Sequence, residues 1–427
     1  MIVVSKRVAA YIFNKVCILT FQTLICIVFF LSLMSSLYIS RTITPLLHRY
    51  IDHFPIVVLL GARQVGKTTL ARHEYPHYHY VSLEDPDTRA FATDDPRGFL
   101  ATCGSQAIID EIQRVPILFS YLQRIVDESP SFRYILTGSH NYLLMEQVTQ
   151  SLAGRAGIIT LLPLSYQEVS SAQTDMPTLL ATLHRGSYPR VIAHGMPPAL
   201  HYPNYIQTYI ERDVRLLKNI GDISSFARFV KLCAGRVGQI LNYSSLATDA
   251  GVSVQTVRSW LSIVETSFLF YTLPPYHQNF NKRIIKMPKL YCYDTGLLCS
   301  LLGINEPEQI ATHFAQGAIM ENYVLGELFR AKYNYGLPAQ LSYWRDSNGL
   351  EVDCIIEHTP TTISLVEIKA SATLHTQFFS SVAKVGKLFA DKGFECRSAV
   401  VYGGSEHQVR TTAQVLPWFA VEEILGQ

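Results

Sequence analysis

The fold of this chain is decided by Ile56-Val57-Val58-Leu59-Leu60-Gly61-Ala62-Arg63-Gln64-Val65-Gly66-Lys67-Thr68-Thr69. The first five residues are apolar and are bounded by Pro55 and Gly61, which predicts a strand buried on both faces of a parallel sheet. Residues 61–68 fit the phosphate-loop pattern G-x-x-x-x-G-K-[ST] in full. A helix is expected from Thr69 onward, so the loop would join a buried strand to a helix.

Each residue type in this loop has a physical reason. The two glycines let the backbone curl until successive N–H groups face a phosphate, and the following helix adds the positive end of its dipole. Lys67 would reach the β- and γ-phosphates, and the Thr68 hydroxyl would ligate Mg²⁺. We therefore expect residues 61–69 to bind ATP with Mg²⁺. The alternative is a glycine-rich turn with an exposed lysine.

Two acids supply the second half of such a site. The run Ala107-Ile108-Ile109-Asp110-Glu111 reads as an apolar strand that ends in carboxylates. Asp110 would hold the hydration shell of Mg²⁺, and Glu111 would polarise the attacking water. The next strand ends in Thr137-Gly138-Ser139, where a hydroxyl such as that of Ser139 could sense the γ-phosphate. Arg155 could be an arginine finger that stabilises charge in the transition state, or a surface arginine.

The order of elements predicts the wider fold. Strand-like runs alternate with helical stretches as far as Thr137, which favours a doubly wound α/β domain. From Tyr166 to about Val230 the pattern is helical and poor in strands. The last third combines a helix over Gly317–Lys332 with paired strands at Leu341–Trp344, Leu350–Glu357 and Ile363–Lys369.

Several motifs together bring a family into view. They are Leu59 to Thr68, Tyr80-Val81-Ser82-Leu83-Glu84-Asp85-Pro86, Ile109-Asp110-Glu111-Ile112-Gln113, Leu136-Thr137-Gly138-Ser139, Leu152-Ala153-Gly154-Arg155, Tyr209-Ile210-Glu211-Arg212-Asp213-Val214, Lys289-Leu290-Tyr291, Glu321-Asn322-Tyr323-Val324 and Glu351-Val352-Asp353. With them, nearly everything from Arg41 onward resembles the bacterial and archaeal AAA-type P-loop ATPases that carry a carboxy-terminal, nuclease-like domain of unknown function. The resemblance implies an oligomer in which Arg155 acts as a finger across a subunit boundary.

The fold class expected from pattern and resemblance is α/β. It comprises an AAA-type P-loop NTPase core, a helical and winged-helix middle domain, and a restriction-endonuclease-like α/β carboxy-terminal domain. The predicted boundaries are a hydrophobic leader (1–40), the ATPase core (41–165), a helical subdomain (166–235), a winged-helix-like domain (236–300) and a nuclease-like domain (301–427).

A helix–turn–helix is predicted over residues 240–264. Ser253 is a good N-cap, and Val254, Val257 and Leu261 are expected on one apolar face. The second helix could enter a DNA groove with Arg258, supported by the local positive charge of Lys282, Arg283, Lys286 and Lys289. The same unit could equally be a lid or a protein-docking module.

A second candidate site lies in the last third. Asp353 precedes Glu367-Ile368-Lys369 in the order D…E-x-K, which resembles restriction-endonuclease-like nucleases. Period-two alternation puts Glu367 and Lys369 on one face of their strand. Asp353 and Glu367 would hold Mg²⁺, while Lys369 activates water for phosphodiester attack. Glu321 or Glu327 could be a fourth member, and a plain ion pair between Lys369 and an acid is the alternative.

Composition and the amino terminus leave some questions open. The net charge of +2 selects neither nucleic acid nor membrane, and the eight cysteines stand singly without a CxxC pair, which argues against zinc sites and disulfides. Residues 16–39 are apolar and long enough to cross a bilayer, which would leave the catalytic part in the cytosol. Alternatively, the first 33 residues are a mis-assigned start, Met34 begins a cytoplasmic protein, and no membrane is involved. Relatives in the resembling family start near Met34.

Two functions follow from these patterns. In the first, a Mg²⁺-dependent ATPase drives a winged-helix and nuclease-like half that acts on DNA or RNA. In the second, an ATP-dependent signalling or scaffold protein, tethered to a membrane if the leader is real, binds protein and cleaves nothing.

Overall fold

The computed structural model describes residues 38–138, 151–173, 177–209, 222–276 and 287–426. The chain divides into two compact units, Met1–Ser40 and Arg41–Gln427. The predicted membrane segment lies almost wholly outside the described residues. Within the described ranges, no helix has both the length and the apolar character needed to span a membrane.

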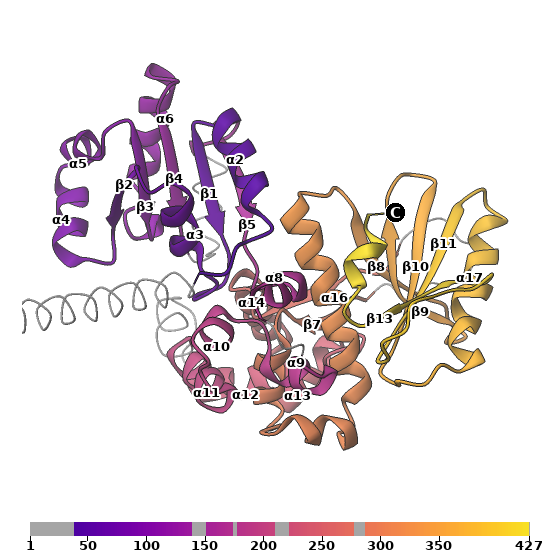
Figure 1. The fold of residues 1–427 in the computed structure, drawn as a ribbon. Helices are drawn as coiled ribbons and strands as arrows, with labels where there is room; N and C mark the ends of the chain where they lie inside the picture. The colour runs from indigo at the N-terminus through magenta and orange to yellow at the C-terminus, as the bar shows by residue number, and fades with distance from the viewer. Residues whose placement is uncertain (1–37, 139–150, 174–176, 210–221, 277–286, 427) are drawn as a thin grey trace, which may run out of the picture. The chain divides into compact units, whose positions relative to one another are not determined.

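The unit that starts at Arg41 contains a five-stranded parallel sheet with the order β2-β3-β4-β1-β5 (Figure 1). Its strands are β1 (Ile56–Leu60), β2 (His79–Ser82), β3 (Gln106–Asp110), β4 (Arg133–Thr137) and β5 (Ala156–Thr160). All five residues of β1 are buried, because Val57 and Leu59 enter one hydrophobic cluster while Ile56, Val58 and Leu60 enter another. A strand flanked by two cores must be apolar at every position, as predicted.

Helices cover both faces of this sheet. Apolar residues of α2 (Thr44–His53) and α3 (Lys67–Glu74) belong to one cluster, and those of α4 (Pro86–Asp94), α5 (Pro96–Cys103) and α6 (Leu118–Glu128) belong to the other. The 3-10 helix η1 (Ile112–Arg114) follows β3. The prediction of an α/β fold with a parallel sheet is confirmed.

Two details of this sheet differ from the prediction. Helix α3 begins at Lys67, two residues before Thr69, because Gly66 takes the left-handed conformation (φ 95°) that ends the loop early. Strand β5 was not foreseen, since Gly157, its second residue, weakens the strand pattern. A Cβ at Gly157 would lie 2.5 Å from the Tyr50 ring and 2.8 Å from that of Phe54, so glycine lets helix α2 approach the strand closely.

A helical region follows the sheet, as expected. Its elements are α8 (Tyr166–Ala172), α9 (Leu179–Arg185), α10 (Pro189–Ala193), α11 (Pro198–Tyr209), α12 (Ile223–Ala234), α13 (Tyr243–Ala250), α14 (Val254–Thr266), the antiparallel pair β6 (Phe270–Leu273) and β7 (Lys289–Cys292), and α15 (Thr295–Leu301). Single bridges join Val237 and Ile240 to β7. Helices α12, α13 and α14 thus stand beside a small sheet.

The turn between α13 and α14 was predicted with one error. The Ser253 side chain accepts a hydrogen bond from the Thr256 N–H as an N-cap, and Val257 and Leu261 are buried. Val254 is 38% exposed, so its assignment to the apolar face was wrong. It is the first residue of the helix, where the chain leaves its packing neighbours.

The last third holds a six-stranded mixed sheet with the order β12-β13-β11-β10-β9-β8. Its elements are η3 (Pro307–Thr312), α16 (Gln316–Tyr335), β8 (Gln340–Arg345), β9 (Glu351–Glu357), β10 (Thr362–Lys369), η4 (Thr376–Phe379), α17 (Ser380–Ala390), β11 (Glu395–Tyr402), β12 (Gln408–Val409), β13 (Gln414–Pro417) and η5 (Val421–Ile424). The predicted strands β8, β9 and β10 form an antiparallel run. The parallel pairing of β10 with β11 was not predicted, because nothing in a single sequence marks a partner 33 residues away, as Glu395 is from Thr362.

One hydrophobic cluster runs through these regions. It contains side chains from Ile43 at the amino-terminal end to Leu425 at the carboxy-terminal end, by way of the helical middle. A separate cluster fills the space between α17 and the mixed sheet, around Trp344 and Phe389.

Asp294 offers a test of how this packing is fixed. Its side chain is 1% exposed, caps α15 through the Leu297 N–H, and accepts hydrogen bonds from the Ser187 N–H and hydroxyl. Replacing Asp294 with Ala leaves buried donors without a partner, so the free energy of unfolding should fall by about 3 kcal/mol. The exposed N-cap Asp222 is the matched control, and Asp222→Ala should cost about 1 kcal/mol. Urea denaturation followed by tryptophan fluorescence measures both, and equal losses would contradict the expectation.

Candidate functional site

The phosphate loop has the backbone that its sequence predicts. Gln64 and Gly66 both have positive φ angles, 61° and 95°, so the chain curls tightly between β1 and α3. A Cβ at Gly61 would lie 2.1 Å from the carbonyl oxygen of Leu161, so only glycine fits where the loop leaves the sheet. The loop is therefore seated against the segment that follows β5.

The predicted polar groups of the loop meet the predicted acid. The Lys67 ammonium donates to the carbonyls of Gly61 and Ala62 at 2.9 and 2.8 Å. The Thr68 hydroxyl donates to a carboxylate oxygen of Asp110 at 2.9 Å. Residues 42 positions apart in sequence are thus brought together because β1 and β3 end at the same edge of the sheet.

Two more hydroxyls converge on the same carboxylate. Thr137, at the end of β4, donates to the Asp110 oxygen that also receives the Thr68 hydroxyl, and Tyr80 donates to the other oxygen at 3.1 Å. Burial, followed by the nearby charge of Asp110, raises the pKa of the Tyr80 phenol. Tyr80 belongs to a quoted motif, but no sequence pattern gave it a role at this site.

A magnesium ion fits this set of donors. Mg²⁺ prefers oxygen ligands and is usually held by one or two carboxylates with water and substrate phosphates. The Thr68 hydroxyl and the Asp110 carboxylate are oxygen donors already within hydrogen-bond distance of each other. They are the residues that would hold the ion.

Glu111 adopts an uncommon backbone conformation directly beside this group. Its φ and ψ are 56° and 43°, a left-handed conformation that costs free energy for a residue with a side chain. Its carboxylate accepts a hydrogen bond from the Gln113 side-chain amide. Glu111 thus lies next to Asp110 in a strained backbone conformation, and its predicted role in polarising water stays a prediction.

The remaining predicted residues of the nucleotide site divide into three cases. Thr69 is exposed on α3. Ser139 lies outside the described residues. The Arg155 guanidinium pairs with Asp127, at 2.5 Å from Nε and 2.9 Å from Nη2, and stays 33% exposed. Arg155 therefore makes a surface ion pair within its own chain, and its predicted action on a neighbouring subunit stays a prediction.

The D…E-x-K residues are also brought together. Asp353 on β9 accepts a hydrogen bond from the backbone N–H of Ile368 on β10 at 2.7 Å. Lys369 pairs with Glu367 at 2.7 Å, which fits their predicted place on one face of β10. We call Asp353, Glu367 and Lys369, together with Glu321, Lys289 and Glu351 described below, the carboxylate cluster.

The structure distinguishes between the two glutamates considered as a fourth member. Glu327 is directed elsewhere, since its carboxylate accepts from the Tyr166 N–H and pairs with Arg330. Glu321 instead lies close enough to Asp353 for their charges to repel. Glu321 and not Glu327 therefore belongs to the carboxylate cluster.

Lys289 corrects another expectation. It was predicted to give positive charge to a nucleic-acid surface, but its side chain is 3% exposed and pairs with Glu321 at 3.0 Å and Glu351 at 2.5 Å. A strand residue of the small sheet is thus buried in the carboxylate cluster. No sequence pattern marks this burial, because a lysine next to Pro288 reads as a surface residue until its neighbours are known.

Burial and mutual repulsion control the protonation of these acids. Burial and the charge of Asp353 raise the pKa of Glu321 to about 7 and that of Glu367 to about 7. Burial also raises the pKa of Asp353. Burial lowers the pKa of Lys369, but the negative charges of Asp353 and Glu367 outweigh it and the net shift is upward. The carboxylate cluster contains more acidic side chains than lysines, and the excess negative charge favours the protonated form of the acids.

Two carboxylates of the carboxylate cluster have the chemistry to hold a divalent cation. One oxygen of Glu367 is buried without a hydrogen-bond partner. Among the described residues, no group of three or more His, Cys, Asp and Glu side chains is arranged to hold a metal ion. Two carboxylates with water or substrate oxygens are enough for Mg²⁺, so Asp353 and Glu367 are the residues that would hold it.

The structure describes one of the other basic residues that were predicted to contact nucleic acid. Lys282, Arg283 and Lys286 lie outside the described residues. Arg258 is exposed on α14, where its guanidinium stacks over the Tyr243 ring at 4.2 Å.

Comparisons with known protein families match three consecutive segments of the chain. The AAA domain family matches residues 53–170, and two domains of unknown function, DUF8612 and DUF4143, match residues 176–308 and 316–421. The uncharacterized proteins Mb2031c of Mycobacterium bovis and Rv2008c of Mycobacterium tuberculosis are each 30% identical over 393 residues, which cover 89% of this chain and 85% of theirs.

More distant similarity was also found. The uncharacterized protein MJ1544 of Methanocaldococcus jannaschii is 22% identical over 312 residues, covering 64% of this chain and 66% of its own. A solved Walker-type ATPase of Pyrococcus abyssi is 15% identical and superposes with a TM-score of 0.41, covering 61% of this chain and 94% of that one. With the phosphate loop, its acid partner and the mycobacterial relatives all in agreement, this chain belongs to the family of Mb2031c and Rv2008c, and its AAA domain is a P-loop ATPase domain.

Proposed function

We propose that the chain binds ATP with Mg²⁺ between residues 61–69 and Asp110 and hydrolyses it with Glu111 as the group that polarises water. The observation that carries this proposal is the 2.9 Å contact between the Thr68 hydroxyl and Asp110 at the edge of the sheet. Bound magnesium would neutralise charge that builds up on the phosphates during transfer.

The residues around it have separate tasks in this proposal. The backbone amides of the loop bind the phosphates, and Lys67 exchanges its contacts with Gly61 and Ala62 for phosphate oxygens. Thr137 and Tyr80 keep the Asp110 carboxylate oriented by donating hydrogen bonds to it. Glu111, held by its strained backbone, takes the proton of the attacking water.

Single substitutions separate binding from hydrolysis. Lys67→Ala should abolish ATP binding, because the phosphates lose their main point charge. Glu111→Gln should leave the affinity within about threefold and lower kcat by about 10²–10⁴, because only general-base action is lost. Isothermal titration and phosphate release measure these quantities, with the exposed Lys384→Ala as the control. Unchanged turnover in both variants would overturn the mechanism.

For the other half of the chain, we propose that the nucleotide cycle drives a nuclease-like domain on nucleic acid. Support comes from Asp353, Glu367 and Lys369 on two neighbouring strands, with the free oxygen of Glu367 in the carboxylate cluster. The three helices α12, α13 and α14 beside a small antiparallel sheet support a winged-helix reading of the middle region. Lys369 would orient water for attack on a phosphodiester.

A metal-dependent cleavage assay tests this half. The full-length protein should cut DNA or RNA in the presence of Mg²⁺ or Mn²⁺, and Lys369→Ala should lose at least about 10²-fold in rate, a loss typical of removing a proton-transfer group. Lys384→Ala, an exposed lysine on α17, should cut like the wild type. Cleavage that persists in Lys369→Ala would remove the proposed active site.

The scaffold function has its own supporting observation. Among the described residues of α14, Arg258 is the only base, and the nearby Lys289 is buried in an ion pair. A second helix with a single base suits a protein partner better than a polyanion. Absence of cleavage of any DNA or RNA by a folded wild type, with ATP hydrolysis intact, would favour this alternative.

The pH dependence of stability tests the carboxylate cluster itself. Glu367 has an ordinary pKa of 4.5 when unfolded and about 7 when folded, so the folded state holds the proton more tightly. Between these two values the folded chain carries more protons than the unfolded one, and stability must fall as pH rises. We expect the free energy of unfolding to drop by about 1–3 kcal/mol from pH 5 to 7.5, and Glu367→Gln to reduce that slope, with the remainder coming from Glu321.

Urea denaturation at a series of pH values gives this slope. Adding Mg²⁺ at pH 7.5 should recover part of the loss in the wild type and none in Glu367→Gln, since the cation neutralises the repelling charges. An identical slope in wild type and variant would mean that Glu367 does not carry the shift.

A further inference from the structure

We propose that Arg41 and Glu168 position the phosphate loop and connect it, through Glu327, to helix α16. This inference rests on the proposed binding of ATP. It adds a positioning pair outside the loop motif and a route by which an occupied loop acts on the carboxy-terminal half.

Arg41 lies against the phosphate loop, and all three nitrogens of its guanidinium group make contacts. It is 6% exposed, and Nη1 donates to the carbonyl of Val65 at 2.8 Å. Nη2 donates to the carbonyl of Leu162 at 2.7 Å, and Nε pairs with Glu168 at 3.2 Å. The three contacts join the middle of the loop, the segment after β5 and helix α8. A lysine has the charge but not this planar fork of donors.

The contact with Val65 fixes an amide that the loop needs. The Val65 carbonyl and the Gly66 N–H belong to one peptide, and the described chain has no cis peptide bond. In a trans peptide these two groups point to opposite sides. By donating to the Val65 carbonyl, Arg41 directs the Gly66 N–H away from itself, toward the opposite side of the loop. Backbone amides of this kind are what a phosphate loop offers to its ligand.

Glu168 is fully engaged in holding Arg41 and the start of α8. One carboxylate oxygen accepts from Arg41 Nε and from the Thr42 N–H at 2.7 Å. The other accepts from the Ser165 N–H at 2.9 Å, and the Ser165 hydroxyl oxygen accepts from the Glu168 N–H, which completes a capping box. Breaking one half of a buried ion pair is costly, so the pair and the helix end move together.

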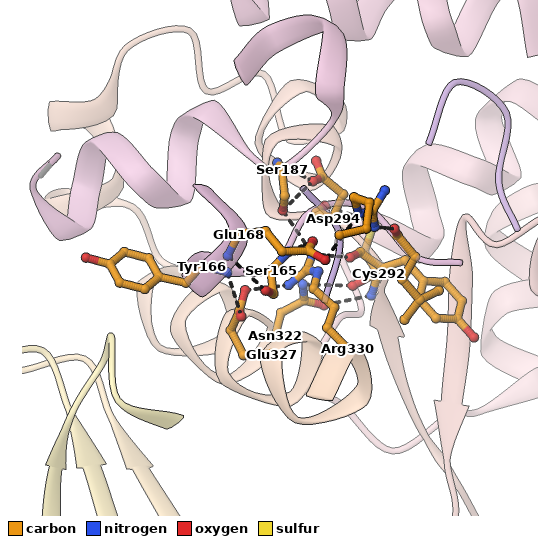
Figure 2. Close-up of polar contacts among 12 residues, drawn as sticks. Ser165, Tyr166, Glu168, Ser187, Cys292, Asp294, Asn322, Glu327 and Arg330 are labelled. Carbon is orange, nitrogen blue, oxygen red and sulfur yellow. Dashed lines mark hydrogen bonds and ion pairs between the residues drawn. The ribbon is translucent and has the colours of Figure 1, made fainter. Parts of the chain in front are cut away.

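The next backbone amide is held from α16. The Tyr166 N–H donates to Glu327 at 2.9 Å, and Glu327 pairs with Arg330 at 2.8 Å, with both side chains 3% exposed. Arg330 continues to the Ser187 hydroxyl and the Tyr293 carbonyl. Figure 2 shows these dashed contacts in succession, from Glu168 and Ser165 through Tyr166 to Glu327 and Arg330. Two consecutive backbone N–H groups at the start of α8 thus donate to carboxylates: that of Ser165 to Glu168 and that of Tyr166 to Glu327. We call the series of contacts from Arg41 through Glu168 and Glu327 to Arg330 the relay.

Helix α16 connects this relay to the carboxylate cluster, because it carries a glutamate of each. Glu321 stands on the same helix as Glu327 and pairs with Lys289. A shift of the loop on binding phosphates is carried by the buried ion pairs of Arg41 with Glu168 and of Glu327 with Arg330, which are costly to break. Occupation of the loop therefore biases the position of α16 and of the cluster attached to it.

Hydrogen exchange on the full chain tests the link. With a slowly hydrolysed ATP analogue and Mg²⁺, exchange should slow at least threefold in residues 61–68, α8 and α16. Glu327→Gln keeps the shape of the side chain but not its charge, so it should bind the analogue within twofold of the wild type and lose the change in α16 alone. A change in α16 that survives in Glu327→Gln overturns the relay.

Steady-state kinetics test the positioning role. Arg41→Lys should raise KM for ATP about tenfold and leave kcat within threefold, because the fixed amide binds substrate and transition state alike. Arg49→Lys, an exposed arginine of α2, is the matched control. A purely structural role would lower the thermal midpoint and leave KM at the control value, which would overturn the proposal. If the wild type does not bind the analogue at all, the ATP-binding proposal itself fails; if it binds normally without a change in α16, only the link fails.

Discussion

The structure depends on one constraint: β1 is buried on both faces between two hydrophobic clusters. Such a strand cannot shift without exposing one of the two cores, so the loop that follows it is held at a fixed point of the sheet edge. Everything at the nucleotide site is placed relative to that point. The Thr68–Asp110 contact, the crowding of Gly61 by Leu161 and the grip of Arg41 on Val65 all follow from it.

The nucleotide site could be predicted from sequence because its signals are local. The phosphate loop is contiguous, and Asp110 ends an apolar run, so parallel strands alone bring them together. Strand β5 could not be predicted with the same ease, since its glycine makes room for the ring of Tyr50 in α2 and for that of Phe54 directly after the helix. Arg41 was equally hidden, because its three partners are 24, 121 and 127 residues away.

The carboxylate cluster shows the same division. The alternation of Glu367 and Lys369 on one strand was readable, whereas the choice of Glu321 over Glu327 was not. Both glutamates stand on one helix six positions apart, and only packing decides which of them faces β9. Lys289 was placed on the wrong surface for the same reason: a single basic residue reveals its surroundings only when distant strands have been brought to it.

The burial of Lys289 has a consequence for how the chain can be divided. Sequence families separate at about residue 310, between the segments 176–308 and 316–421. The lysine lies on one side of this border, and both of its acidic partners lie on the other. Separating the two segments there would leave the buried Lys289 ammonium group without its acidic partners, and Glu321 and Glu351 without their counterion. Lys289 and its two partners therefore join these two segments in the folded protein.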